Sequence, residues 1–259
     1  MLILAGFLTG LLVGLTGVGG GALMTPMLLL LFGVAPTTAV GTDLLFAAIT
    51  KFMASRVHHV HDLIDWQVVK RLWCGSLPGA SLCLLAIYKF PTIADGYGFL
   101  KMAIAGALIL MSFGMIFQKQ LHGIGEHLRR TQAEQFKKKQ GPLTIAAGVL
   151  LGVLVTLTSI GAGALGAVLL VYLYPIRLTP PRLIATDIVH AIPLALFAGL
   201  GHLAMGHVDF SMLLYLLIGS IPGVILGAHF SVRLPYQLLR IILAIVLLFV
   251  GLKFIATSA

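Results

Sequence analysis

Asp43 and Asp187 are the only acidic residues that fall inside the long apolar segments of this sequence. On insertion scales an aspartate at the centre of a membrane helix costs about 2.5–3.5 kcal/mol, which makes each one a candidate functional group. Both directly follow a threonine, Thr42 and Thr186, near the predicted start of a helix, where a carboxylate can also cap free amides. Three roles are therefore open for them: a proton-coupling carboxylate, the polar wall of a binding site, or a helix cap.

Two further polar residues fall in the same two segments. Lys51 lies two turns after Asp43 and could be a cationic ligand or a side chain that snorkels to the membrane surface. His190 lies three residues after Asp187, on the same helix face. Its imidazole suits proton coupling, and a neutral hydrogen-bonding role is equally open.

Glycine clusters interrupt two long apolar segments, 2–32 and 143–174. After each cluster a new helix can begin, and its first amides lack intrahelical partners and carry the positive end of the helix dipole. Such N-termini bind anions, and glycine lets a ligand approach the backbone closely. The residues predicted to bind an anion are Gly19, Gly20, Gly21, Ala22, Gly161, Ala162 and Gly163, with Thr42, Asp43, Lys51, Thr186, Asp187 and His190 completing the wall.

The elements that must position these residues are membrane helices. Of the 259 residues, 59% are hydrophobic and 10% are charged, and the mean hydropathy is +1.06. A soluble domain carries roughly 25% charged residues, and apolar runs of about 18 residues are candidate membrane spans. The composition therefore predicts an all-α, polytopic integral membrane protein. In such a protein the net charge of +9 reflects Lys and Arg that collect on the cytoplasmic side, and it does not indicate nucleic-acid binding.

The sequence also repeats itself. A shift of 144 residues aligns Thr42-Asp43 with Thr186-Asp187, and a shift of 142 aligns Gly6 and Gly10 with Gly148 and Gly152. These last four glycines are predicted to allow close helix packing. Because the matches fall on Gly, Asp and Thr as well as on apolar residues, we expect a first transmembrane repeat over 1–118, a basic cytoplasmic linker over 119–141 and a second transmembrane repeat over 142–259.

The long apolar segments set the architecture. Segment 2–32 would measure about 46 Å as one straight helix, against a hydrocarbon core of about 30 Å. If both long segments are broken and re-entrant, thirteen basic residues fall inside and three outside; if both cross fully, the split is ten against six. The inside set comprises Arg56, Lys70, Arg71, six linker residues, Arg177, Arg182, Arg233 and Arg240. The charge distribution thus favours two inverted repeats, each with one re-entrant helix and three transmembrane helices (39–55, 66–88 and 98–118; 184–201, 210–231 and 238–256).

Several motifs resemble one family. They are Gly19-Gly20-Gly21 followed by Pro26, Phe32-Gly33 with Pro36, Ala39-Val40-Gly41-Thr42, and Gly75-Ser76-Leu77-Pro78-Gly79. This ordered set is similar to the sulfite exporter TauE/SafE family, also called the TSUP family, over nearly the whole chain. The resemblance implies transport of sulfite, sulfonates, sulfoacetate or related organic anions across the bacterial cytoplasmic (inner) membrane, with coupling to an ion or proton gradient. The second copy departs from the motif, with Ala162 at the middle glycine and no proline matching Pro26, so one half-site is expected to be less open.

The sequence therefore predicts a multi-pass secondary transporter and not an enzyme. The alternative is an anion channel with the same helix-terminus site. The expected partners are a small anionic solute and the lipid bilayer, without nucleic acid, and the protein is either a monomer or a homodimer. No cofactor or metal site is expected, because His58, His59 and His61 gather in one loop without a second group of ligands.

Overall fold

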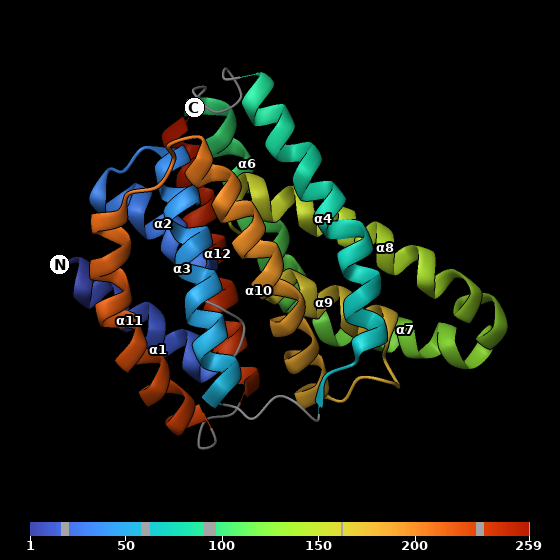
Figure 1. Ribbon diagram of the computed structural model, residues 1–259. Coiled ribbons are helices and arrows are strands. Elements are labelled where there is room, and N and C mark those ends of the chain that lie inside the picture. Colours follow the sequence, from blue (N-terminus) through green and yellow to red (C-terminus); the bar gives the residue numbers. More distant parts are fainter. Residues whose placement is uncertain (17–20, 58–62, 91–96, 162, 232–235, 259) are drawn as a thin grey trace.

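The computed structural model describes residues 1–16, 21–57, 63–90, 97–161, 163–231 and 236–258, and within these ranges every regular element is a helix. The loop that holds His58, His59 and His61 lies outside the described residues. The helices are α1 (Leu2–Thr16), α2 (Gly21–Phe32), α3 (Pro36–Val57), α4 (Trp66–Lys89), α6 (Tyr97–Ile116), α7 (Gln118–Thr131), α8 (Ala133–Thr158), α9 (Ala164–Leu173), α10 (Pro180–Ala204), α11 (Phe210–Ser231) and α12 (Tyr236–Ser258) (Figure 1).

In the described part of the chain, five helices are long and apolar enough to cross a membrane: α4, α6, α8, α10 and α11. Many large apolar side chains on the outside of the bundle are exposed, which suits a surface that faces lipid. The predicted all-α, polytopic membrane fold is confirmed. The six predicted spans coincide within a few residues with helices, of which α4, α6, α10 and α11 are among these five and α3 and α12 are not. The fifth candidate, α8, was predicted as part of a re-entrant segment.

The extensive helix contacts join the first half of the sequence to the second. Helix α1 packs along α11, and its counterpart by the 142-residue shift, α8, packs along α4. Helices α6 and α12 form another such pair, as do α3 and α10. In Figure 1, α3 runs from the top to the bottom of the view and α10 runs from the bottom to the top. This matched pairing supports the predicted repeat, whose inverted placement in a bilayer stays a prediction.

Glycines allow two of these helix pairs to pack backbone to backbone. A Cβ atom at any of the four repeat-related glycines would collide with a carbonyl oxygen of the opposite helix. The contacts are equivalent in the two halves: Gly6 lies on Leu216, Gly10 on Ser220, Gly148 on Leu72 and Gly152 on Ser76. The prediction that these glycines permit close packing is therefore confirmed, in the way small residues act between membrane helices.

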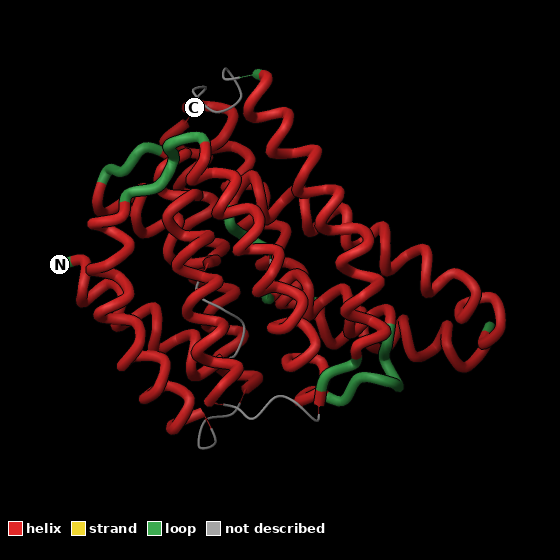
Figure 2. The backbone as a smooth tube through the Cα atoms, viewed as in Figure 1, coloured by secondary structure: helices red, strands yellow, loops and turns green. Residues whose placement is uncertain are grey.

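The basic stretch between the halves is itself helical. It forms α7 and the beginning of α8, which extend away from the main bundle as a helical hairpin joined by a short turn (Figure 2). Helix α7 packs on α9, where Gly125 lies against the carbonyl oxygen of Tyr172. The boundary at residue 142 falls inside α8, so the linker and the second repeat share one continuous helix. The division into two repeats and a linker stays a prediction.

Candidate functional site

The second glycine cluster breaks a helix inside the bundle. Helix α8 ends at Thr158, and Ser159 (φ 59°), Gly161 (φ 124°) and Gly163 (φ 125°) all adopt positive φ before α9 begins at Ala164. Glycine takes up such angles without the steric cost of a side chain. No side chain caps α9 at Gly163. The amide of Gly166 donates to the carbonyl oxygen of Gly161 at 3.1 Å, which leaves the amides of Ala164 and Leu165 at the start of α9 without a capping side chain in the described part of the chain.

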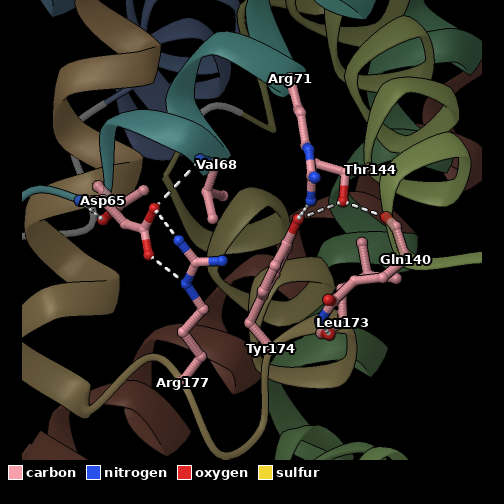
Figure 3. A network of polar contacts seen from close by, with 9 residues as sticks. Asp65, Val68, Arg71, Gln140, Thr144, Leu173, Tyr174 and Arg177 are labelled. Carbon is pink, nitrogen blue, oxygen red and sulfur yellow. Dashed lines mark hydrogen bonds and ion pairs between the residues drawn. The ribbon is translucent and has the colours of Figure 1, made fainter. Parts of the chain in front are cut away.

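After this break the chain turns back to the side from which α8 came. The Gln140 amide donates to the carbonyl oxygen of Leu173 at 2.5 Å, and the hydroxyls of Thr144 and Tyr174 lie 2.8 Å apart (Figure 3). Gln140 lies in the early part of α8, and Leu173 lies in the last turn of α9. Segment 143–174 thus folds back on itself, as a re-entrant hairpin requires, and its placement in a bilayer stays a prediction.

The first long segment shows the same path on either side of its break. Helix α1 ends at Thr16 and α2 begins at Gly21, and the predicted site residues Gly19 and Gly20 lie outside the described residues, as does Ala162 in the second half. Leu2, near the start of α1, packs in the same apolar cluster as Phe32 at the end of α2. The two ends of segment 2–32 therefore border the same part of the core, which is compatible with a re-entrant pair.

Contacts between basic residues and their partners bear on whether the second long segment crosses the membrane fully. Arg177 forms a bidentate ion pair with Asp65, with N–O distances of 2.6 and 2.8 Å, and the guanidinium of Arg71 donates to the Tyr174 hydroxyl at 3.3 Å (Figure 3). Full crossing would place Arg177 and Arg71 on opposite sides of the membrane. These contacts place them at one end of the bundle, as the charge distribution predicts.

Thr42 and Thr186 join the two halves to each other. The amide of Asp65 donates to Thr186 Oγ1 and the amide of Asp209 donates to Thr42 Oγ1, each over 3.1 Å. Asp65 matches Asp209 in the 144-residue shift, so the two hydrogen bonds are equivalent. Both threonine hydroxyls, proposed as part of the solute site, therefore hold the start of a helix from the other half.

Asp43 binds helix α2. Its Oδ2 accepts from the Thr25 amide at 3.1 Å and from the Thr25 hydroxyl at 2.5 Å, while its Oδ1 has no hydrogen-bond partner. The side chain is fully buried. Asp43 thus caps an amide of a neighbouring helix and not of its own, and this amide of α2 is not open to a solute. Thr25 was missed by the sequence analysis, although a polar residue beside Pro26 in an otherwise apolar helix could have marked it.

Asp187 occupies the equivalent place in the second half. Its carboxylate lies so close to Gly166, in the first turn of α9, that a Cβ atom there would collide with Oδ1. That oxygen has no hydrogen-bond partner, and the residue is 2% exposed. Each aspartate therefore packs against one of the two short helices that follow a break, and among the described residues only Asp43 receives hydrogen bonds from that helix.

Lys51 and His190 lie beside the two aspartates. Lys51 is 2% exposed, which excludes snorkelling, and its ammonium is within electrostatic range of both Asp43 and Asp187. His190 is fully buried, its Nε2 lies 3.0 Å from the Ser76 hydroxyl, and its Nδ1 has no hydrogen-bond partner among the described residues. The structure thus brings four of the predicted residues into one buried cluster. Ser76 was noted only as part of a repeated motif.

The comparisons with known proteins agree with one another. The family model for "Sulfite exporter TauE/SafE" matches residues 2–254. The chain is 40% identical to the "Probable membrane transporter protein YjnA" of Bacillus subtilis, over 98% of each chain. It is 25% identical to YunE of the same organism over 98% of this chain and 96% of the relative, and 26% identical to YdhB over 93% of each; both carry the same description.

No solved structure matches the chain. The family model matches almost the whole length of the chain, and the multi-pass helical fold with its broken helices agrees with that match. This protein belongs to the sulfite exporter TauE/SafE family of membrane proteins, and its relatives are described as probable membrane transporters.

Proposed function

We propose that this protein is a secondary transporter that carries a small sulfur-containing or organic anion, such as sulfite, a sulfonate or sulfoacetate, across the bacterial cytoplasmic membrane. The observation that carries the proposal is the buried cluster of Asp43, Lys51, Asp187 and His190, which lies between the central helices α3 and α10 and beside the re-entrant helices. Ionisable groups are rare at this depth, and transport pathways are one of the places that retain them.

The broken helices support an anionic solute. Helix α9 begins within the bundle with no side-chain cap at Gly163, so its first amides and its dipole favour a negative group. Two discontinuous helices at matched positions of repeated halves are typical of secondary transporters. Besides Gly161 and Gly163, the proposed ligands in the described chain include the backbone at Gly21 and Ala22, which open α2.

Lys51 supplies the positive charge that an anion needs. Its ammonium already faces two carboxylates, so a solute anion competes with Asp187 for the ammonium and for the first turn of α9. The unpartnered Nδ1 of His190 offers a hydrogen bond on the same side of α10. Binding therefore involves displacement of Asp187 or neutralisation of its charge, which favours a carrier coupled to a cation gradient over simple diffusion of the anion.

The test is transport by the purified protein in proteoliposomes. Uptake of labelled sulfite, thiosulfate, sulfoacetate and acetate is measured with and without imposed proton and sodium gradients. We expect flux of at least one sulfur-containing anion, stimulation by a gradient and acceleration by the same anion on the opposite side. Flux without such counterflow indicates the channel alternative, and absence of flux for every anion contradicts the proposal.

A pair of lysine variants ties the flux to the cluster. Lys51→Met removes the buried ammonium and should abolish uptake. Lys89→Met, at the exposed end of α4, removes the same charge outside the buried cluster and should leave uptake unchanged. Equal activity of the two variants would show that the solute does not use the cluster.

A further inference from the structure

The end of α8 faces a carboxylate oxygen that nothing in the described chain binds. Asp43 uses Oδ2 to hold Thr25, which leaves Oδ1 without a hydrogen-bond partner although the residue is fully buried. The Ser159 side chain, 4% exposed, lies close enough to this carboxylate to interact with it, but its hydroxyl forms no hydrogen bond of good geometry with the carboxylate or with any other described group. Two buried oxygens from different helices thus lie together, and each lacks the ligand or hydrogen bond that burial normally demands.

The backbone adds oxygens of the same kind. The last helical hydrogen bond of α8 runs from the Ser159 amide to the carbonyl of Val155. The carbonyl of Thr156 accepts a hydrogen bond from His202 Nε2 at 2.9 Å. The carbonyls of Leu157 and Thr158 lie beyond this last bond, so no amide of α8 can donate a hydrogen bond to them. The C-terminal end of a helix also carries negative partial charge. A carboxylate and a helix C-terminus are therefore packed against each other.

The charges in the cluster leave a deficit of one positive charge. Lys51 from α3 is within electrostatic range of both Asp43 and Asp187, and His190 from α10 is the other titratable group beside it. When Asp43 and Asp187 are both ionised, the single ammonium of Lys51 leaves a net charge of minus one in a buried site. A monovalent cation would neutralise it, and a carboxylate, a hydroxyl and backbone carbonyls are the oxygen ligands that hard cations prefer.

We propose that the break between α8 and α9 holds a sodium ion, bound by Asp43 Oδ1, Ser159 Oγ and the terminal carbonyls of α8. Unwound backbone at the C-terminal end of a half-helix is a recurring way to bind sodium in transporters. Only the coupling role of this ion depends on the proposed function, because in that case the ion and the anion would be carried together. The binding of sodium itself does not require that the protein transports anything.

The experiment measures sodium binding without any anion. Purified protein in detergent is titrated with NaCl at constant ionic strength, with choline or potassium chloride as the replacement salt, and the apparent melting temperature is followed. Because a ligand that binds only the folded state stabilises it, we expect a saturable rise with sodium and none with potassium or choline. Equilibrium binding of radioactive sodium to the wild-type protein provides an independent measurement that needs no variant.

Matched variants locate the ion. Ser159→Ala and Asp43→Asn should each weaken apparent sodium affinity by about tenfold or more, equivalent to about 1.4 kcal/mol. Ser112→Ala is the control: Ser112 is a buried serine of α6 that donates to the Ala244 carbonyl at 2.6 Å, so its loss should lower the melting temperature and leave the sodium shift intact.

Two outcomes overturn the site. One is the absence of sodium binding to the wild-type protein, including the case in which only pH, and not sodium, shifts its stability. The other is a Ser159→Ala variant that binds sodium as tightly as the Ser112→Ala control. Anion flux that is independent of sodium, together with sodium binding, would contradict the coupling role alone, whereas sodium binding without any anion flux would contradict the proposed function and leave the site standing.

Discussion

The carboxylate of Asp187 lies directly against Gly166, in the first turn of α9, where a side chain as small as a methyl group would collide with it. Asp43 makes the corresponding contact in the first half, where the amide and hydroxyl of Thr25 bind it. The protein's own carboxylates thus lie at the helix starts that we propose to receive an anion. This places two like charges and one lysine at the centre of the molecule and leads to the following predictions.

Gly166→Ala should impair transport more than it impairs folding. The added methyl group pushes the Asp187 carboxylate away from α9, and such overpacking in a buried site typically destabilises by about 1–3 kcal/mol. Gly106→Ala is the matched control, because a Cβ at Gly106 on α6 meets nothing within 4 Å, so the better helix propensity of alanine is its main effect. Anion uptake in proteoliposomes and melting in detergent measure both quantities. Normal uptake by Gly166→Ala would contradict the placement of Asp187 in the transport site.

Lys51→Met should strongly destabilise the protein, and Asp187→Asn should partly restore stability to it. Removal of one partner from a buried set of charges leaves the other uncompensated, which typically costs about 3–5 kcal/mol. In the double variant only one carboxylate remains near position 51. A double-mutant cycle on the melting temperatures measures the coupling. Additive effects of the two substitutions would mean that the ammonium and the carboxylate do not interact.

Arg177→Gln should destabilise the folded protein by about 1–2 kcal/mol, because it removes a bidentate, charge-assisted pair whose carboxylate partner, Asp65, is buried. The pair Arg130–Glu126 on α7 offers a control, because both side chains are substantially exposed. Arg130→Gln should change stability by only about 0.3–0.5 kcal/mol. Similar small effects of both substitutions would show that the Asp65 pair contributes no more than a surface pair.

Cysteines placed on either side of the re-entrant hairpin should react from the same side of the membrane. In a background that lacks Cys74 and Cys83, Lys137→Cys precedes the hairpin and Thr179→Cys follows it, and both positions are exposed. We expect an impermeant thiol reagent to label both from the cytoplasmic side. Labelling from opposite sides would contradict the re-entrant path, and labelling of both from outside would contradict the predicted orientation.

Much of the fold was open to sequence reasoning. The span predicted over 66–88 is α4 (Trp66–Lys89), and that over 210–231 is α11 (Phe210–Ser231), because the free energy of transfer to lipid depends on composition along the chain. The helix break at Gly161 and Gly163 was predictable because local backbone preference marks it. The start of α8 at Ala133 was not, since its first turns are polar and give no hydropathy signal of a span.

The sequence by itself determined that this chain is a polytopic helical membrane protein with repeated, glycine-broken segments, because hydropathy, glycine positions and charge distribution are local properties. Only the tertiary structure decided which residues meet. Asp43 binds Thr25, His190 faces Ser76 and Arg177 pairs with Asp65, and the last two contacts join residues more than a hundred positions apart. Such contacts depend on how helices from the two halves pack against each other, and no local pattern along the chain encodes that packing.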